Sequence, residues 1–162
     1  MSVSFSIDEI FEMAEEIEAN GAKFYREAAK KSGDETVSKI FSDLAAMEDG
    51  HYEIFKDMRS NLGSEEKEKI QYDPDNEAGF YLQAMANLHG SEGKKDRDTY
   101  LTGKETMDEV FRIAVDAEKN SVVFYTALKD LVSGPGKGKI ADIIREELGH
   151  LVILQGRLAQ LS

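Results

Sequence analysis

Six residues of types that bind metals fall where helical periodicity places the core of the protein. Apolar residues recur every three or four positions around them, as Phe11 and Ala14 do before the first of the six. Burying an ionised carboxylate costs several kcal/mol unless an opposite charge pairs with it. Two divalent cations would balance four carboxylates, so the sequence predicts a site for two metal ions. The six residues are Glu18, Glu48, His51, Glu118, Glu147 and His150.

The spacing of these residues strengthens the prediction. Glu48 precedes His51 by three positions, as Glu147 precedes His150, so each acid and imidazole share one helix face. Glu48 follows Glu18 by 30 residues, and Glu147 follows Glu118 by 29. One Glu from each of two helices, with Glu-x-x-His from each of two others, is a known pattern of dinuclear sites in helical bundles. Carboxylates with one imidazole per metal suit iron or manganese best, and zinc also accepts them.

The two halves of the chain repeat each other. Residues 6–25 resemble residues 106–125 at an offset of 100, and both stretches end in Phe-Tyr. After the first loop the offset becomes 99, so that Glu48 and His51 correspond to Glu147 and His150. The chain therefore consists of two related helical hairpins.

Start and stop signals give the bounds of the elements. The capping boxes Ser6-Ile7-Asp8-Glu9 and Thr106-Met107-Asp108-Glu109 begin the first and third main helices. Hairpin 1 is predicted at about 6–60, with its second helix from about 35, and hairpin 2 at about 106–161. A turn over 133–138 precedes the last helix, which is predicted from about 139. The crossover 61–105 is predicted to hold a helical turn at 65–70 and a short helix at 75–88.

These hairpins cannot bury their apolar faces alone, and pairing them gives a four-helix bundle. The fold class predicted is all-α, with the two hairpins joined by a long crossover. The length of 162 residues favours a single domain over 1–162.

Composition removes several classes of function. The chain has no cysteine, which excludes thiolate catalysis, iron–sulfur clusters and disulfides. A formal net charge of −12 disfavours binding to nucleic acid. The N-terminus lacks the basic and apolar regions of a signal peptide, and no apolar run is long enough to span a membrane. We therefore expect a cytoplasmic protein that does not bind membranes.

Four segments carry a resemblance to a known family. They are Glu18-Ala-Asn-Gly-Ala-Lys-Phe-Tyr25, Glu48-Asp-Gly-His51, Glu118-Lys-Asn-Ser-Val-Val-Phe-Tyr125 and Glu147-Leu-Gly-His150. They resemble the rubrerythrin-like branch of the ferritin-like di-iron carboxylate proteins, across both hairpins. The resemblance implies a ferritin-like bundle with two iron ions that react with peroxide or dioxygen. It also implies that Glu48 and Glu147 bridge the irons, that Glu18 and Glu118 are terminal ligands, and that each iron has one histidine.

Two departures from the family limit what the resemblance implies. Rubrerythrins carry a rubredoxin domain, whereas this chain has no cysteine, so we expect a separate protein to donate electrons. They also carry a further carboxylate one turn after the glutamate of the third helix, where this chain has Ser121, with Gly21 as its counterpart. The alternatives to a peroxide- or dioxygen-reducing enzyme are a ferroxidase for iron storage or transfer, and a structural metal site.

The remaining predictions concern residues near the metal site and the surface that would form a homodimer. Tyr25 and Tyr125 lie two turns from Glu18 and Glu118, where each would hydrogen-bond a ligand carboxylate, quench radicals or simply fill the core. Glu146 is predicted to point away from the site. The helix at 75–88 is predicted to form the surface of a homodimer.

Overall fold

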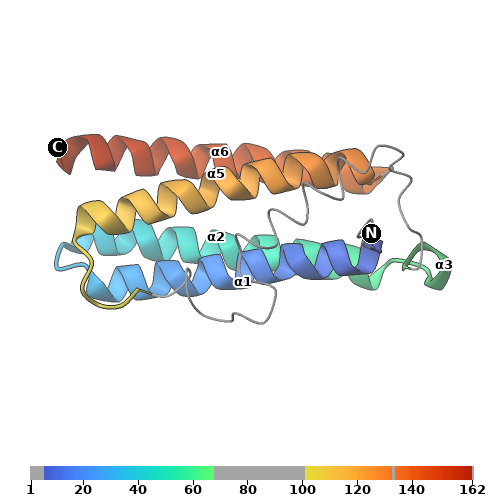
Figure 1. Ribbon diagram of the computed structural model, residues 1–162, viewed down its shortest axis with the longest axis horizontal. Coiled ribbons are helices and arrows are strands. Elements are labelled where there is room, and N and C mark those ends of the chain that lie inside the picture. Colours follow the sequence, from blue (N-terminus) through green and yellow to red (C-terminus); the bar gives the residue numbers. More distant parts are fainter. Residues whose placement is uncertain (1–5, 68–100, 133, 162) are drawn as a thin grey trace, which may run out of the picture.

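Four long helices form two antiparallel hairpins in the structure, a computed structural model that describes residues 6–67, 101–132 and 134–161. The first hairpin consists of α1 (Ile7–Lys31) and α2 (Glu35–Ser60), and the second of α5 (Met107–Leu131) and α6 (Pro135–Leu161). A short helix, α3 (Ser64–Lys67), follows α2. Figure 1 shows the two hairpins lying side by side, which confirms the predicted all-α four-helix bundle. The helix predicted at 75–88, and with it the dimer surface, lies outside the described residues.

The predicted capping boxes begin two of these helices. The Ser6 hydroxyl accepts a hydrogen bond from the Glu9 backbone, and the Glu9 carboxylate accepts one from the Ser6 backbone at 2.7 Å. Thr106 and Glu109 make the same reciprocal pair ahead of α5. Each box satisfies backbone N–H groups that have no partner within the helix. These bonds fix where α1 and α5 begin, and so which residues face the core.

The start of α6 differs from the prediction. The helix begins at Pro135 rather than near residue 139, so the glycine-rich stretch is partly its first turn. Proline suits the first helical position because its missing N–H would have no partner there. Gly134 precedes it with a φ of 72°, a left-handed conformation that glycine adopts without strain. The helical turn predicted at 65–70 overlaps α3, and residues 68–70 lie outside the described residues.

Two apolar clusters fill the bundle, one toward each end. The cluster near the start of α1 includes Phe11, Phe55 and Tyr125, and the ring centroids of Phe55 and Tyr125 are 5.0 Å apart. The cluster near the end of α1 includes Phe41 and Phe111, with ring centroids 4.9 Å apart. Both ring pairs join α2 to α5 and therefore hold the two hairpins together. The middle of the bundle, between the clusters, is shielded from water at both ends.

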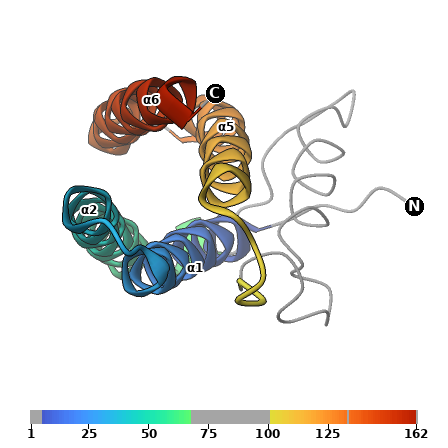
Figure 2. The same ribbon diagram turned by 90° about the vertical axis from the view of Figure 1, so that its left-hand side faces the viewer.

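The view along the bundle shows how the helices surround that middle region. Each hairpin forms one side, with α1 beside α5 and α2 facing α6 (Figure 2). Every long helix can therefore direct residues from its midpoint toward the same central volume. No helix among the described segments is long and apolar enough to cross a membrane.

Candidate dinuclear metal site

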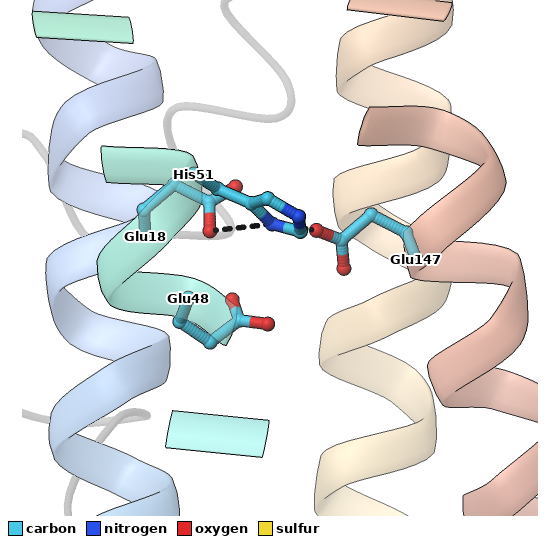
Figure 3. Close-up of side chains that lie close together, drawn as sticks. All are labelled: Glu18, Glu48, His51 and Glu147. Carbon is cyan, nitrogen blue, oxygen red and sulfur yellow. Dashed lines mark ion pairs between the residues drawn. The ribbon is translucent and has the colours of Figure 1, made fainter. Parts of the chain in front are cut away.

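The six predicted ligands meet at the centre of the bundle. Each is buried, with at most 4% of its surface exposed. They form two groups in which the ligand atoms all lie within 4.8 Å of one another. The first group takes Glu18, Glu48 and His51 from the first hairpin and Glu147 from the second, as Figure 3 shows. The second group is Glu48, Glu118, Glu147 and His150. Glu48 and Glu147 belong to both groups, which is the position expected of residues that bridge two metals.

Both histidines turn the same ring nitrogen toward the carboxylates. His51 Nδ1 lies 2.7 Å from Glu147 Oε1 and 3.4 Å from Glu18 Oε2. His150 Nδ1 lies 3.2 Å from Glu48 Oε1 and 3.3 Å from Glu118 Oε1. The two rings are stacked with centroids 5.9 Å apart. Nδ1 is therefore the atom that each histidine offers to a metal.

The polar atoms of the site fit metal ions better than they fit one another. Among the described residues, eight buried side-chain nitrogens and oxygens have no hydrogen-bond partner, and all eight belong to the six ligands. His51 Nδ1 and Glu147 Oε1 are among them, because their 2.7 Å contact lacks the geometry of a hydrogen bond. Buried polar atoms nearly always have partners, so this concentration needs an explanation. Two divalent cations would give these atoms partners and balance the four carboxylates.

Burial and mutual contact shift the protonation of the ligands. Burial raises the pKa of Glu18 and Glu118 well above the usual range, and nearby carboxylates add to the effect. Burial would lower the pKa of His51, but contacts with Glu147 and Glu18 raise it to about 11. The pKa of His150 rises to about 12, because contacts with Glu118, Glu147 and Glu48 outweigh burial. Protons thus balance the charge when no metal is bound, and metal binding must release them.

Two buried tyrosines connect the hairpins at the site. The Tyr25 hydroxyl donates a hydrogen bond to Glu118 Oε1, and the Tyr125 hydroxyl donates one to Glu18 Oε1. Of the roles considered for these tyrosines, the structure shows the hydrogen bond to a ligand carboxylate. The partner is the glutamate of the other hairpin, which helix periodicity alone could not reveal. Each tyrosine thereby orients a carboxylate that the opposite helix supplies.

Glu146 was predicted to point away from the site, and this prediction is wrong. Its Oε2 atom lies 2.7 Å from Nε2 of His51, on the side of the ring away from the other ligands. The error arose because Glu146 does face outward on its own helix, with half of its side chain exposed. The contact runs from α6 to α2, and only the packing of the two hairpins brings it about.

A small cavity leads to the site between α1 and α5. Its volume is about 50 Å³, and it reaches Glu48, Glu118 and Tyr25. Gly21 and Ser121, the two counterpart positions noted in the sequence, both line it. The volume suits one or two molecules the size of water. The cavity therefore offers a route by which a small molecule can reach the ligands.

Gly21→Ala is expected to weaken metal binding by about tenfold or more, the range seen when the surroundings of a ligand are disturbed. A Cβ atom at Gly21 would lie 2.8 Å from Glu48 Oε2, so the carboxylate would have to move. The measurement is metal affinity by calorimetric titration. Gly50→Ala in α2 is the matched control, because its Cβ would meet nothing within 4 Å. The control should keep its affinity and gain about 0.5–1 kcal/mol of stability. Equal affinities in both variants would contradict the predicted role of Gly21.

The fold and the site together define a four-helix bundle with a buried dinuclear carboxylate–histidine centre. The family model for rubrerythrin matches residues 9–158, and the chain belongs to the rubrerythrin family. A solved structure from Thermotoga maritima, described as a candidate ferritin-like diiron-carboxylate protein, is similar over 100% of both chains. The two share 26% sequence identity with a TM-score of 0.73, which confirms the ferritin-like bundle. No curated protein sequence matches the chain significantly.

Proposed function

We propose that the protein is a non-haem di-iron oxidoreductase that reduces peroxide or dioxygen with electrons from a separate donor protein. The observation that carries this proposal is the pair of overlapping buried ligand groups that share Glu48 and Glu147. Family membership and the diiron description of the similar structure support iron as the metal. Manganese and zinc also suit the donor set.

Each ligand has a distinct role in this proposal. Glu48 and Glu147 would bridge the two metals, because each belongs to both groups. Glu18 and Glu118 each bind one metal and are held by a tyrosine from the opposite hairpin. His51 and His150 bind through Nδ1 as neutral imidazoles. The site then carries four negative charges against the four positive charges of two ferrous ions.

The surroundings of the ligands suit the reduction of a small oxidant. Two ferrous ions held by these six residues would supply two electrons for cleavage of the O–O bond of peroxide, which with two protons gives two waters. The cavity admits a molecule of that size next to Glu48 and Glu118. The apolar clusters at both ends keep bulk water out of the centre. In this proposal a separate donor protein returns the two electrons.

One observation favours a second candidate function, the oxidation of iron for storage or transfer. Ser121, where rubrerythrins carry a further carboxylate, is buried, and its hydroxyl donates a hydrogen bond to the Ala117 carbonyl at 3.1 Å. It thus offers no carboxylate to a metal. The six-ligand set lacks the further carboxylate that the resemblance associates with rubrerythrins, so ferroxidase activity stays as the alternative.

Stopped-flow reaction of the iron-loaded protein tests the proposal. The chain is loaded anaerobically with two ferrous ions and mixed with either one equivalent of peroxide or dissolved dioxygen. We expect rapid formation of a ferric absorption spectrum, full recovery on chemical reduction, and repeated turnover when reductant is in excess. Glu147→Ala serves as the control and should show none of these steps.

The alternative functions predict different results in the same experiment. A protein for iron storage would continue to oxidise added Fe(II) and retain many iron atoms per chain. A structural site would hold metal but would not react with either oxidant. Either result would contradict the proposed oxidoreductase.

A further inference from the structure

We infer that Glu146 makes the two metal positions unequal, so that the position at His51 binds its metal more tightly than the position at His150. Glu146 acts in this inference as a positioning residue for His51 and does not bind metal itself. The inference rests on the dinuclear site of the proposed function, but it does not depend on which oxidant the site reduces.

The two histidines differ at the ring nitrogen that faces away from the ligands. Nε2 of His51 lies 2.7 Å from the carboxylate of Glu146. Nε2 of His150 is buried and has no hydrogen-bond partner among the residues that the structure describes. The two pseudo-symmetric histidines therefore differ in one respect: His51 has a carboxylate partner at Nε2, and in the described part of the chain His150 has none.

The sequence explains this difference. At the offset of 99 that relates Glu147 to Glu48, the counterpart of Glu146 is Met47. A thioether is only a weak hydrogen-bond acceptor and carries no charge. In the first hairpin Met47 directly precedes Glu48. In the second hairpin Glu146 directly precedes Glu147. The second hairpin thus supplies a carboxylate to His51, whereas the first supplies none to His150.

A carboxylate behind a histidine strengthens metal binding in two ways. It accepts the proton of the far nitrogen, which fixes the tautomer that leaves the Nδ1 lone pair free for the metal. It also holds the plane of the ring and raises the basicity of the ligand nitrogen. Loss of such a partner typically reduces metal affinity by about 10- to 100-fold. Because half of the Glu146 side chain is exposed, we expect the lower part of this range.

Anaerobic titration with Co(II) tests the inference, because cobalt is coloured and does not react as iron does. The wild-type chain should bind two Co(II) ions in two separable steps. Glu146→Gln should weaken the tighter step by about tenfold and leave the weaker step unchanged. Met47→Glu should strengthen the weaker step, because it supplies the missing carboxylate to His150. Glu53→Gln on α2 is the control, because it removes the same charge from an exposed side chain. It should alter neither step.

Two further variants identify which position each step represents. Glu18 belongs only to the His51 group and Glu118 only to the His150 group. In a Glu118→Gln background the remaining site contains His51, so adding Glu146→Gln should weaken it about tenfold. In a Glu18→Gln background the same addition should have no effect. The metal-free Glu146→Gln chain should keep its helical circular dichroism spectrum and a cooperative thermal transition, which separates positioning from a general loss of structure.

Two outcomes would overturn the inference, and they have different meanings. Two Co(II) ions bound with affinities that Glu146→Gln leaves unchanged would disprove the role of Glu146 while preserving the dinuclear site. A wild-type chain that binds no Co(II), Fe(II) or Mn(II) would disprove both the site and the inference.

Discussion

Glu147→Ala is expected to abolish tight binding of both metals, whereas Glu18→Gln and Glu118→Gln are each expected to remove one. The reason is that Glu147 belongs to both ligand groups, and each of the other two glutamates belongs to one. Glu48→Ala should behave like Glu147→Ala. The measurement is metal content per chain by elemental analysis, after loading with Fe(II) and dialysis under anaerobic conditions.

The glutamine variants are chosen because they keep an oxygen for the tyrosine of the opposite hairpin. Tyr125 can still donate a hydrogen bond to residue 18, and Tyr25 to residue 118. A loss of metal in these variants then reflects the lost ligand charge rather than collapse of the centre. Retention of two tightly bound irons by Glu147→Ala or Glu48→Ala would show that the ligand set is wrong.

The metal-free protein is expected to lose stability as pH rises from about 6 to 9. His51 and His150 have a pKa of about 11 and about 12 in the folded chain, against about 6.5 in an unfolded chain. Above about pH 6.5 the folded state therefore binds more protons than the unfolded state, and the free energy of unfolding falls as pH rises. The raised pKa values of Glu18 and Glu118 act in the same direction.

Bound metal is expected to reverse this trend. Metal binding needs neutral histidines and ionised carboxylates, so affinity rises with pH as protons are released. At a free metal concentration 100 times the dissociation constant, binding adds about 2.7 kcal/mol to the free energy of unfolding. Thermal unfolding with chelator and with Mn(II), at several pH values, measures both trends. A metal-free protein that is equally stable at pH 6 and pH 9 would contradict the predicted protonation of the site.

The sequence predicted the ligands well because they break a regular pattern. Glu18 and Glu118 interrupt apolar stripes that are otherwise continuous, and the structure shows that both are buried. The capping boxes at Ser6 and Thr106 fixed two helix starts, because their hydrogen bonds are made within four residues. Local signals of this kind depend on the chain nearby and not on the packing of the hairpins.

The features that the sequence did not predict arise where separate helices meet. Glu146 faces outward on α6, and its contact with His51 exists only because α2 packs against that face. Which glutamate each tyrosine would contact could not be predicted either, since both bonds cross between hairpins. The start of α6 was predicted too late for a local reason. The glycines around Pro135 favour a turn, whereas the proline itself favours the first position of a helix.

The crossed bonds between tyrosines and glutamates bear on how such a chain could have arisen. One hairpin, paired with an identical copy across a two-fold axis, would already provide both tyrosine–glutamate bonds and a complete set of six ligands. In such a dimer, however, every residue is present twice, so positions 47 and 146 would have to be the same amino acid. Duplication within one gene removes that constraint. The counterpart pairs Met47 and Glu146, and Gly21 and Ser121, are differences that a fused chain can carry and a pair of identical hairpins cannot.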